Sequence, residues 1–199
     1  IDRLVNSAHA NNLDSVVLTF FPHPRMVLQK ESDIKLINTI GERKQLLDQT
    51  GIDHLVVHPF THQFSRLTAL EFVRDILVNK LRAKKIIIGY DHRFGRNRTA
   101  DINDLKQFGK DFGFEVEEIS QQDVEQVAVS STKIRKALLD GRVEQANIYL
   151  QSEFTLKGTV VRGRGIGKDL GYPTANMEIP EDYKLIPKNG VYVVRSVLD

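Results

Sequence analysis

The sequence predicts an α/β fold with a parallel sheet over the first part of the chain. Short apolar runs rich in β-branched residues, such as SVVLTF at residues 15–20, alternate with segments of helical length. Two of these segments open with capping boxes, Thr39 with Glu42 and Thr68 with Glu71. Strands that alternate with helices of this length are typical of parallel βαβ units with right-handed crossovers, so we expect a Rossmann-like sheet.

The expected elements follow one another along the chain. After the run at residues 15–20, the expected strands are residues 54–58, 85–88 and 115–119. The expected helices begin after caps at Thr39, Thr68 and Asp101 and end near Gly51, Leu81 and Phe112. Because parallel strands present their carboxyl ends to the same edge of a sheet, the loops that follow them should line one crevice.

The composition is that of an ordinary globular protein and excludes several classes. The 199 residues are 41% hydrophobic and 27% charged, which suits one large domain or two small ones. The absence of cysteine excludes disulfides and thiolate metal sites, and a reducing cytoplasm is the simplest compartment. No apolar run reaches the ~18 residues of a membrane span, and a net charge of +2 does not indicate nucleic acid as the main partner.

The segment VSSTKIRKAL, residues 129–138, opens a helix with three hydroxyl side chains, Ser130, Ser131 and Thr132. The first turn of a helix has unpaired N–H groups and the positive end of the macrodipole, so it can hold a phosphate. Arg135 lies one turn into the helix and can direct its guanidinium at the same phosphate. The alternative is an ordinary capped helix that ends at Gly141.

The segment GYDHRFG, residues 89–95, follows the expected strand at 85–88. Gly89 ends the strand, and Asp91 and Gly95 lie just beyond it, where open α/β sheets bind their ligands. The alternative is a plain turn in which Asp91 makes local hydrogen bonds.

Histidines in the expected loops raise the question of a metal. His58 and His62 have a helical spacing, but Pro59 stands between them, so we set a zinc site aside. His23 lies between Pro22 and Pro24, and its stiff, extended backbone suits a side chain aimed at a ligand or simply a rigid loop.

The character of the chain changes after about Gln151. Strand-like runs, FTLKGTVV and GVYVVRSVL, flank a glycine-rich segment at residues 162–176 that shows no helical period. A loop of this kind can wrap a phosphate, and Thr174 and Asn176 offer neutral oxygens suited to Mg2+. The alternative is a long β-hairpin loop whose glycines only permit turns.

Four segments, taken together, resemble one family. TFFPHP, IIIGYDHRFGRNRTAD, VSSTKIRKALLDG and GIGKDLGYPTAN occur here in the order found in the bacterial bifunctional riboflavin kinase/FMN adenylyltransferases. The resemblance implies that residues 1–152 are an FMN adenylyltransferase domain, which transfers AMP from ATP to FMN and gives FAD and pyrophosphate. It implies that residues 153–199 are the first part of a β-barrel riboflavin kinase domain that makes FMN from riboflavin, with Mg2+ as cofactor.

The resemblance also implies roles for individual residues. The ATP-binding residues would be Gly89, Asp91, Ser130, Ser131, Thr132 and Arg135, with Arg135 the catalytic candidate. The flavin-binding residues would be Pro22, His23, Pro24, Phe94 and Gly95. The kinase residues for ATP and Mg2+ would be Gly165, Gly167, Lys168, Pro173, Thr174 and Asn176, with Thr174 and Asn176 as metal ligands.

Two parts of the family pattern do not occur within residues 1–199: the first strand with its histidine-glycine-histidine loop, and the catalytic glutamate of the kinase. We therefore interpret the chain as an internal fragment of a longer enzyme. The alternatives are another adenylyltransferase of the same fold, acting on a different nucleotide, and a flavin- or nucleotide-binding module without catalysis. A homo-oligomer is left open.

Overall fold

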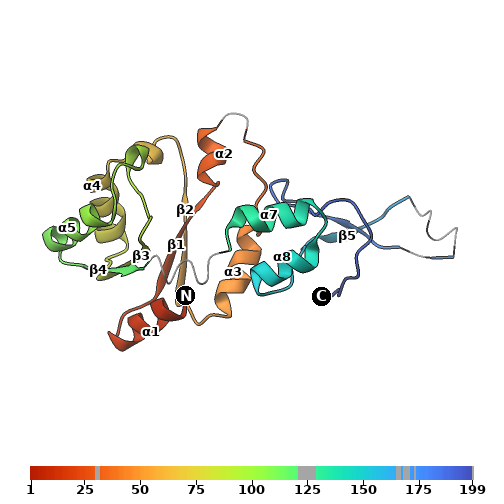
Figure 1. The fold of residues 1–199 in the computed structure, drawn as a ribbon, viewed down its shortest axis with the longest axis horizontal. Coiled ribbons are helices and arrows are strands. Elements are labelled where there is room, and N and C mark those ends of the chain that lie inside the picture. The colour runs from red at the N-terminus through yellow and green to blue at the C-terminus, as the bar shows by residue number, and fades with distance from the viewer. Residues whose placement is uncertain (30–31, 121–128, 165–166, 168–170, 173, 199) are drawn as a thin grey trace. The chain divides into compact units, whose positions relative to one another are not determined.

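The computed structural model describes residues 1–29, 32–120, 129–164, 167, 171–172 and 174–198. The chain forms two compact units (Figure 1). Unit 1 contains Ile1–Asp33 and Leu46–Ala128, and unit 2 contains Ile34–Gln45 and Val129–Asp199. Unit 2 therefore combines two pieces of the expected first domain, residues 34–45 and 129–152, with the expected second domain.

Unit 1 contains two pairs of parallel strands. β1 (Val16–Phe21) pairs with β2 (His54–Pro59), and β3 (Lys85–Gly89) pairs with β4 (Glu115–Ile119). The strand positions and their parallel direction confirm the mixed α/β prediction. In the described part of the chain each pair is a separate sheet, not one sheet of four strands. Hydrophobic periodicity predicts strands but does not say which strands are neighbours.

The helices of unit 1 begin where the sequence predicts. Thr68 caps α4 (Ala69–Glu71), which continues as the π-helical η2 (Phe72–Lys80), and Asp101 caps α5 (Ile102–Phe112). Both starts are capping boxes with reciprocal side-chain and backbone hydrogen bonds. The described residues of unit 1 also form α1 (Asp2–Ala10), α2 (Pro24–Leu28), η1 (Phe64–Arg66) and η3 (Arg96–Arg98).

The core of unit 1 lies between η2, α5 and the strand pair β3 and β4, which lie side by side in Figure 1. Its buried members are Val73, Phe94, Ala100, Leu105 and Phe114. Phe94 therefore belongs to the core although it lies in the loop after β3.

A hydrogen-bonded pair joins the starts of β1 and β2. Ser15 is fully buried, and its N–H and Oγ donate to Asp53 Oδ2 at 2.8 and 2.6 Å. These bonds hold the pKa of the Asp53 carboxyl below its usual value. The pair fixes the register of the two strands at the edge opposite the expected site.

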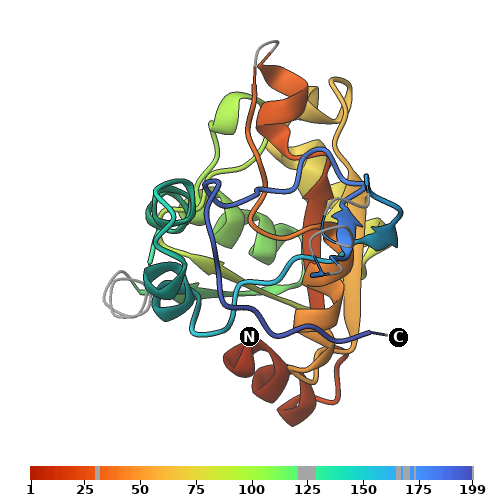
Figure 2. The ribbon, with the colours of Figure 1, turned by 90° about the vertical axis from the view of Figure 1, so that its right-hand side faces the viewer.

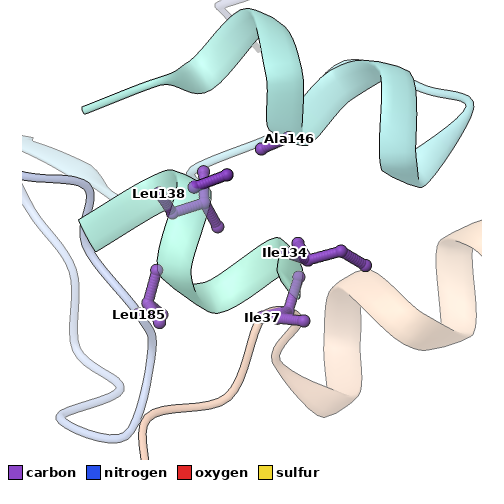
Figure 3. Packing of buried hydrophobic residues seen from close by; sticks show 6 residues of the cluster. Ile37, Ile134, Leu138, Ala146 and Leu185 are labelled. Atoms are coloured by element: carbon purple, nitrogen blue, oxygen red, sulfur yellow. The ribbon is translucent and has the colours of Figure 1, made fainter. Parts of the chain in front are cut away.

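Unit 2 is built on two helices, α7 (Ser131–Leu139) and α8 (Val143–Leu150), which pack side by side (Figure 2). Together with α3 (Ile40–Asp48), whose first part belongs to this unit, they account for the helices of 34–45 and 129–164. The buried cluster of unit 2 joins residues far apart in the sequence, Ile37, Ile134, Ala137, Leu138, Ala146 and Leu185 (Figure 3). The C-terminal part of the chain thus contributes to the same core as α7 and α8.

The remaining strands of unit 2, β5 (Thr159–Val161) and β6 (Asn176–Glu178), pair in antiparallel fashion. β5 confirms a strand at the end of the FTLKGTVV run, whereas β6 was not expected from the sequence. The strand expected from GVYVVRSVL is wrong for the described part of the chain, because residues 190–198 form no strand and Val191 and Val193 are fully exposed. Alternating apolar residues favour a strand only where another strand is available to pair with it.

Gly95 provides a test of the loop between β3 and α5. Its φ of +73° with ψ of 179° belongs to a region used almost only by glycine. An added Cβ would also lie 2.8 Å from the backbone N of Ala69. We expect Gly95→Ala to lower the free energy of unfolding by more than about 3 kcal/mol, measured by urea denaturation.

The matched control is Gly113→Ala at the end of α5. Gly113 also has a positive φ, +74°, but no atom lies within 4 Å of an added Cβ. Gly113→Ala should lower the free energy of unfolding by about 1 kcal/mol, which is the cost of a positive φ in alanine without a steric clash. Equal losses for the two variants would show that the loop does not pack on α4 as described.

Candidate functional site

An aromatic cluster lies at the carboxyl ends of the strands of unit 1. Its members are Phe20, Phe60, Phe64, Phe72 and Phe94. The ring of Phe20, on β1, lies 5.9 Å from Phe60 and 5.3 Å from Phe64, which follow β2. Phe72 lies 6.5 Å from Phe20 and 6.1 Å from Phe94, which follows β3. The end of β1 and the loops after β2 and β3 therefore converge, as the parallel strand direction predicts.

The loop at residues 22–24 is rigid for a local reason. His23 has an extended backbone, with φ −60° and ψ 139°, and is the N-cap of α2. The backbone N–H of Arg25 donates to His23 Nδ1 at 3.2 Å, and Pro24 occupies the first position of the helix. The expected extended backbone at His23 is confirmed. The flavin-binding role of Pro22, His23 and Pro24 stays a prediction.

The GYDHRFG loop is held to the protein through its second half. Phe94 exchanges backbone hydrogen bonds with Ala100 at 3.1 and 3.3 Å, and Gly95 lies against the backbone of Ala69. The first half of the loop is more open, because Asp91 is exposed. An added Cβ at Gly89 would lie 3.4 Å from Asp91 Oδ1, so the two residues are close neighbours. Packing explains Phe94 and Gly95, whereas Asp91 faces solvent and is accessible to a ligand.

In unit 2, the first turn of α7 has features expected both of an ordinary capped helix and of a phosphate-binding helix end. Ser130 is the N-cap, and its Oγ accepts a hydrogen bond from the backbone N–H of Lys133 at 3.3 Å. Ser131 and Thr132 are exposed in the first turn. Gly141 follows the helix with a φ of +79°. The turn is therefore a capped helix end that is also accessible to an anion.

Arg135 makes a contact that the sequence did not indicate. Its Nε donates to the backbone carbonyl of Lys35 at 3.1 Å, although 100 residues separate the two positions in the chain. This bond fixes the orientation of the half-buried guanidinium on the side of α7. No local pattern predicts such a bond, because it depends on how the segment before α3 packs on α7.

The glycine-rich segment is described in part. Gly167, Thr174 and Asn176 lie among the described residues, and Gly165, Lys168 and Pro173 lie outside them. An added Cβ at Gly167 would lie 3.0 Å from Thr174 Oγ1, and one at Gly163 would lie 2.0 Å from Asn176 Nδ2. Glycine at these two positions lets the segment lie directly against both side chains.

Thr174 and Asn176 are exposed and carry neutral side-chain oxygens. Such oxygens can bind Mg2+ when a substrate phosphate supplies further ligands. Across the residues that the structure describes, no group of three or more His, Cys, Asp or Glu side chains gathers as a metal site would require. None of the described helices is both long enough and apolar enough to cross a membrane.

Substituting Ser130 separates an ordinary helix cap from a phosphate site. Ser130→Asp keeps a good N-cap, so the free energy of unfolding should stay within about 0.5 kcal/mol of wild type. If a phosphate binds at this turn, the added carboxylate should weaken ATP binding at least about tenfold, as measured by calorimetry.

The complementary variant is Ser130→Ala, which removes the cap but adds no charge. It should cost about 1 kcal/mol of stability and leave ATP binding closer to wild type than Ser130→Asp does. Unchanged ATP affinity in Ser130→Asp would mean that the turn serves only as a capped helix end.

Comparison with known proteins links both parts of the chain to flavin metabolism. The FAD synthetase family model matches residues 1–133, and the riboflavin kinase family model matches residues 150–199. The first match covers all of unit 1, including the aromatic cluster, together with residues 34–45 and the start of α7 from unit 2. The second covers the glycine-rich segment and β5 and β6.

Two curated relatives carry the name bifunctional riboflavin kinase/FMN adenylyltransferase. The protein of Buchnera aphidicola subsp. Schizaphis graminum is 37% identical over 196 residues, covering 98% of this chain and 62% of the relative. That of Listeria monocytogenes is 37% identical over 189 residues, covering 94% of this chain and 59% of the relative.

A solved structure, described as a macrolide-efflux protein from Streptococcus pneumoniae, is similar with a TM-score of 0.82 at 34% identity. It is covered over 62% of its length, and 96% of this chain is matched. The chain thus spans about three-fifths of the length of these proteins. On the family match over residues 1–133 and the similarity to these relatives, the chain belongs to the FAD synthetase family.

Proposed function

We propose that the chain is part of a bifunctional enzyme of FAD biosynthesis. Residues 1–152 would transfer AMP from ATP to FMN, and residues 153–199 would be the first part of a β-barrel domain that phosphorylates riboflavin. The names of the two bacterial relatives support both activities. The observation that carries the proposal is the exposed, Ser130-capped first turn of α7 with Arg135 on the same helix.

Adenylyl transfer makes few chemical demands on side chains. A phosphate oxygen of FMN attacks the α-phosphorus of ATP, the bond to the β-phosphate oxygen breaks, and pyrophosphate leaves with the negative charge. The protein has to position two anions and stabilise the charge on the leaving group. An exposed helix N-terminus and a guanidinium are suited to that task.

The residues proposed to bind ATP are Ser130, Ser131, Thr132 and Arg135 in unit 2, and Gly89 and Asp91 in unit 1. The first turn of α7 would bind leaving-group phosphates through its backbone N–H groups, and Arg135 would neutralise them. Its Nε bond to Lys35 leaves the guanidinium with a defined orientation, which favours a positioning role over a mobile surface charge.

The proposed flavin site lies at the aromatic cluster. Pro22, His23 and Pro24 follow β1, and Phe94 and Gly95 follow β3, so both groups belong to the strand ends that converge there. Flat aromatic walls of this kind suit an isoalloxazine ring. Phe94 is 7% exposed, so we expect it to shape the wall from behind more than to contact the ring face.

The proposed kinase site uses the glycine-rich segment. Thr174 and Asn176 would hold Mg2+. Gly165, Gly167, Lys168 and Pro173 would lie around the ATP phosphates. Mg2+, when bound, would neutralise charge on those phosphates. The segment joins the antiparallel strands β5 and β6, and the close approach of Gly167 to Thr174 is compatible both with a hairpin loop and with one that wraps a phosphate.

The riboflavin kinase match at residues 150–199 favours FMN over another adenylyl acceptor. An adenylyltransferase for a different nucleotide gives no reason for that second match. The cytoplasm and small-molecule partners, ATP, FMN and riboflavin, follow from this proposal.

The direct test is FAD formation. The chain is mixed with FMN and MgATP, and FAD is separated by chromatography, alongside calorimetric ATP binding to the same protein. We expect saturable ATP binding and FAD that appears only when both substrates are present. A protein that binds neither ATP nor FMN would contradict the proposal.

Arg135→Ala should cut the kcat/KM of adenylyl transfer by about 100-fold while FMN affinity changes little, because the lost charge faces the leaving phosphates. The matched control is Lys136→Ala, an exposed cation one position further along the same helix. It should change kcat/KM less than about twofold. Equal effects on adenylyl transfer and FMN binding in Arg135→Ala would count against the phosphate role.

A further inference from the structure

One lysine in the part of the chain matched by the riboflavin kinase model has no exposed side-chain surface. The ammonium of Lys184 donates to Glu42 Oε2 at 2.6 Å and to the backbone carbonyl of Ile37 at 2.7 Å. It also lies 4.5 Å from the centre of the Phe154 ring. Burying an ammonium is costly unless it is paired and hydrogen-bonded, so these contacts are required for the side chain to lie there.

The carboxylate partner is fixed by its own helix. Glu42 is 4% exposed and closes the capping box of α3, with its Oε2 accepting from the backbone N–H of Thr39 at 2.8 Å. Its Oε1 is buried without a hydrogen-bond partner within the described part of the chain. Burial lowers the pKa of Lys184, and the hydrogen bond from its ammonium to Glu42 opposes that shift. The ammonium is thus tied to the first turn of α3.

Backbone hydrogen bonds continue the same contact. Leu36 N–H donates to the carbonyl of Tyr183 at 2.7 Å, and Leu185 N–H donates to the carbonyl of Leu36 at 2.8 Å. Lys35 Nζ donates to the carbonyl of Asp182 at 2.9 Å. Residues 35–37 are therefore held along one side by residues 182–185.

The other side of residues 35–37 faces Arg135. The carbonyl of Lys35 accepts the hydrogen bond from Arg135 Nε, and Ile37 packs beside Ile134 in the cluster shown in Figure 3. A continuous series of contacts thus runs from Lys184 through residues 35–37 to the guanidinium of Arg135. Apolar packing holds these segments together, and the hydrogen bonds set where the Lys35 carbonyl lies.

We infer that Lys184 is a positioning residue for Arg135, so that the kinase part of the chain holds the phosphate-binding arginine of the adenylyltransferase part in place. This inference rests on the proposed role of Arg135 in adenylyl transfer. Lys184 itself touches no reacting group and acts through the backbone of residues 35–37.

The first readout is independent of activity. In 15N-labelled chain, the Arg135 Nε–H signal is assigned by its loss in Arg135→Lys, and its exchange with solvent is measured. Lys184→Met should speed this exchange about five- to tenfold, because the hydrogen bond to Lys35 is weakened. The matched control, Lys188→Met, removes an exposed lysine from the same segment and should leave the exchange unchanged.

The second readout is a double-mutant cycle on ATP binding. Lys184→Met should weaken ATP binding about five- to tenfold in the wild-type background and have almost no effect in Arg135→Ala. Unchanged Nε–H exchange, or a Lys184→Met loss that adds fully to that of Arg135→Ala, would overturn the inference. If Arg135→Ala alone leaves ATP binding unchanged, the proposed phosphate role fails, and the exchange measurement still decides the positioning.

A milder variant covers the case in which Lys184→Met does not fold. Lys35→Met removes the hydrogen bond to the Asp182 carbonyl and keeps the buried ion pair. It should speed Arg135 Nε–H exchange in the same direction by a smaller factor. Exchange equal to wild type in this variant would overturn the inference as well.

Discussion

Unit 2 depends on burying one ammonium and one carboxylate together. Lys184 and Glu42 are 142 residues apart in the chain, and neither could be buried without the other at acceptable cost. Because Glu42 also caps α3, the pair fixes the segment before α3 to the C-terminal part of the chain. The Arg135 guanidinium is hydrogen-bonded to that segment, so we infer that the ion pair helps to set the orientation of this proposed phosphate-binding side chain.

In unit 1, contacts between aromatic rings bring the carboxyl ends of separate strands together. Among the described residues, no backbone hydrogen bonds between strands join the two strand pairs into one sheet. Aromatic side chains contact one another across the ends of the two pairs instead. Phe72, on η2, contacts rings from both sides and so joins the loop after β3 to β1. We propose this aromatic cluster as one wall of the flavin site, and the His23 loop follows β1 at the same strand ends.

Local features of the fold could be predicted from the sequence, and long-range ones could not. The capping boxes at Thr39, Thr68 and Asp101 were predictable because their hydrogen bonds join residues three positions apart. Strand positions followed from β-branched runs. Strand neighbours did not, and residues 190–198 show that an apolar alternation forms no strand without a partner.

The same distinction holds for the candidate site. Motif resemblance indicated Asp91, Ser130 and Arg135, and the structure gives each a local geometry that suits or explains it. The Arg135 bond to Lys35 and the burial of Lys184 had no sequence signal, because a lysine in DYKLIPK has the pattern of an ordinary surface residue. Such contacts depend on tertiary packing alone.

Binding of ATP phosphates at the first turn of α7 is tested most directly by backbone amide shifts. ATP is titrated into 15N-labelled chain, and the amides of residues 131–133 are compared with those of residues 102–104, which open the similarly capped helix α5. We expect saturable shifts at the first turn of α7 and none at α5. Shifts of equal size at both helix ends, or none at α7, would contradict it.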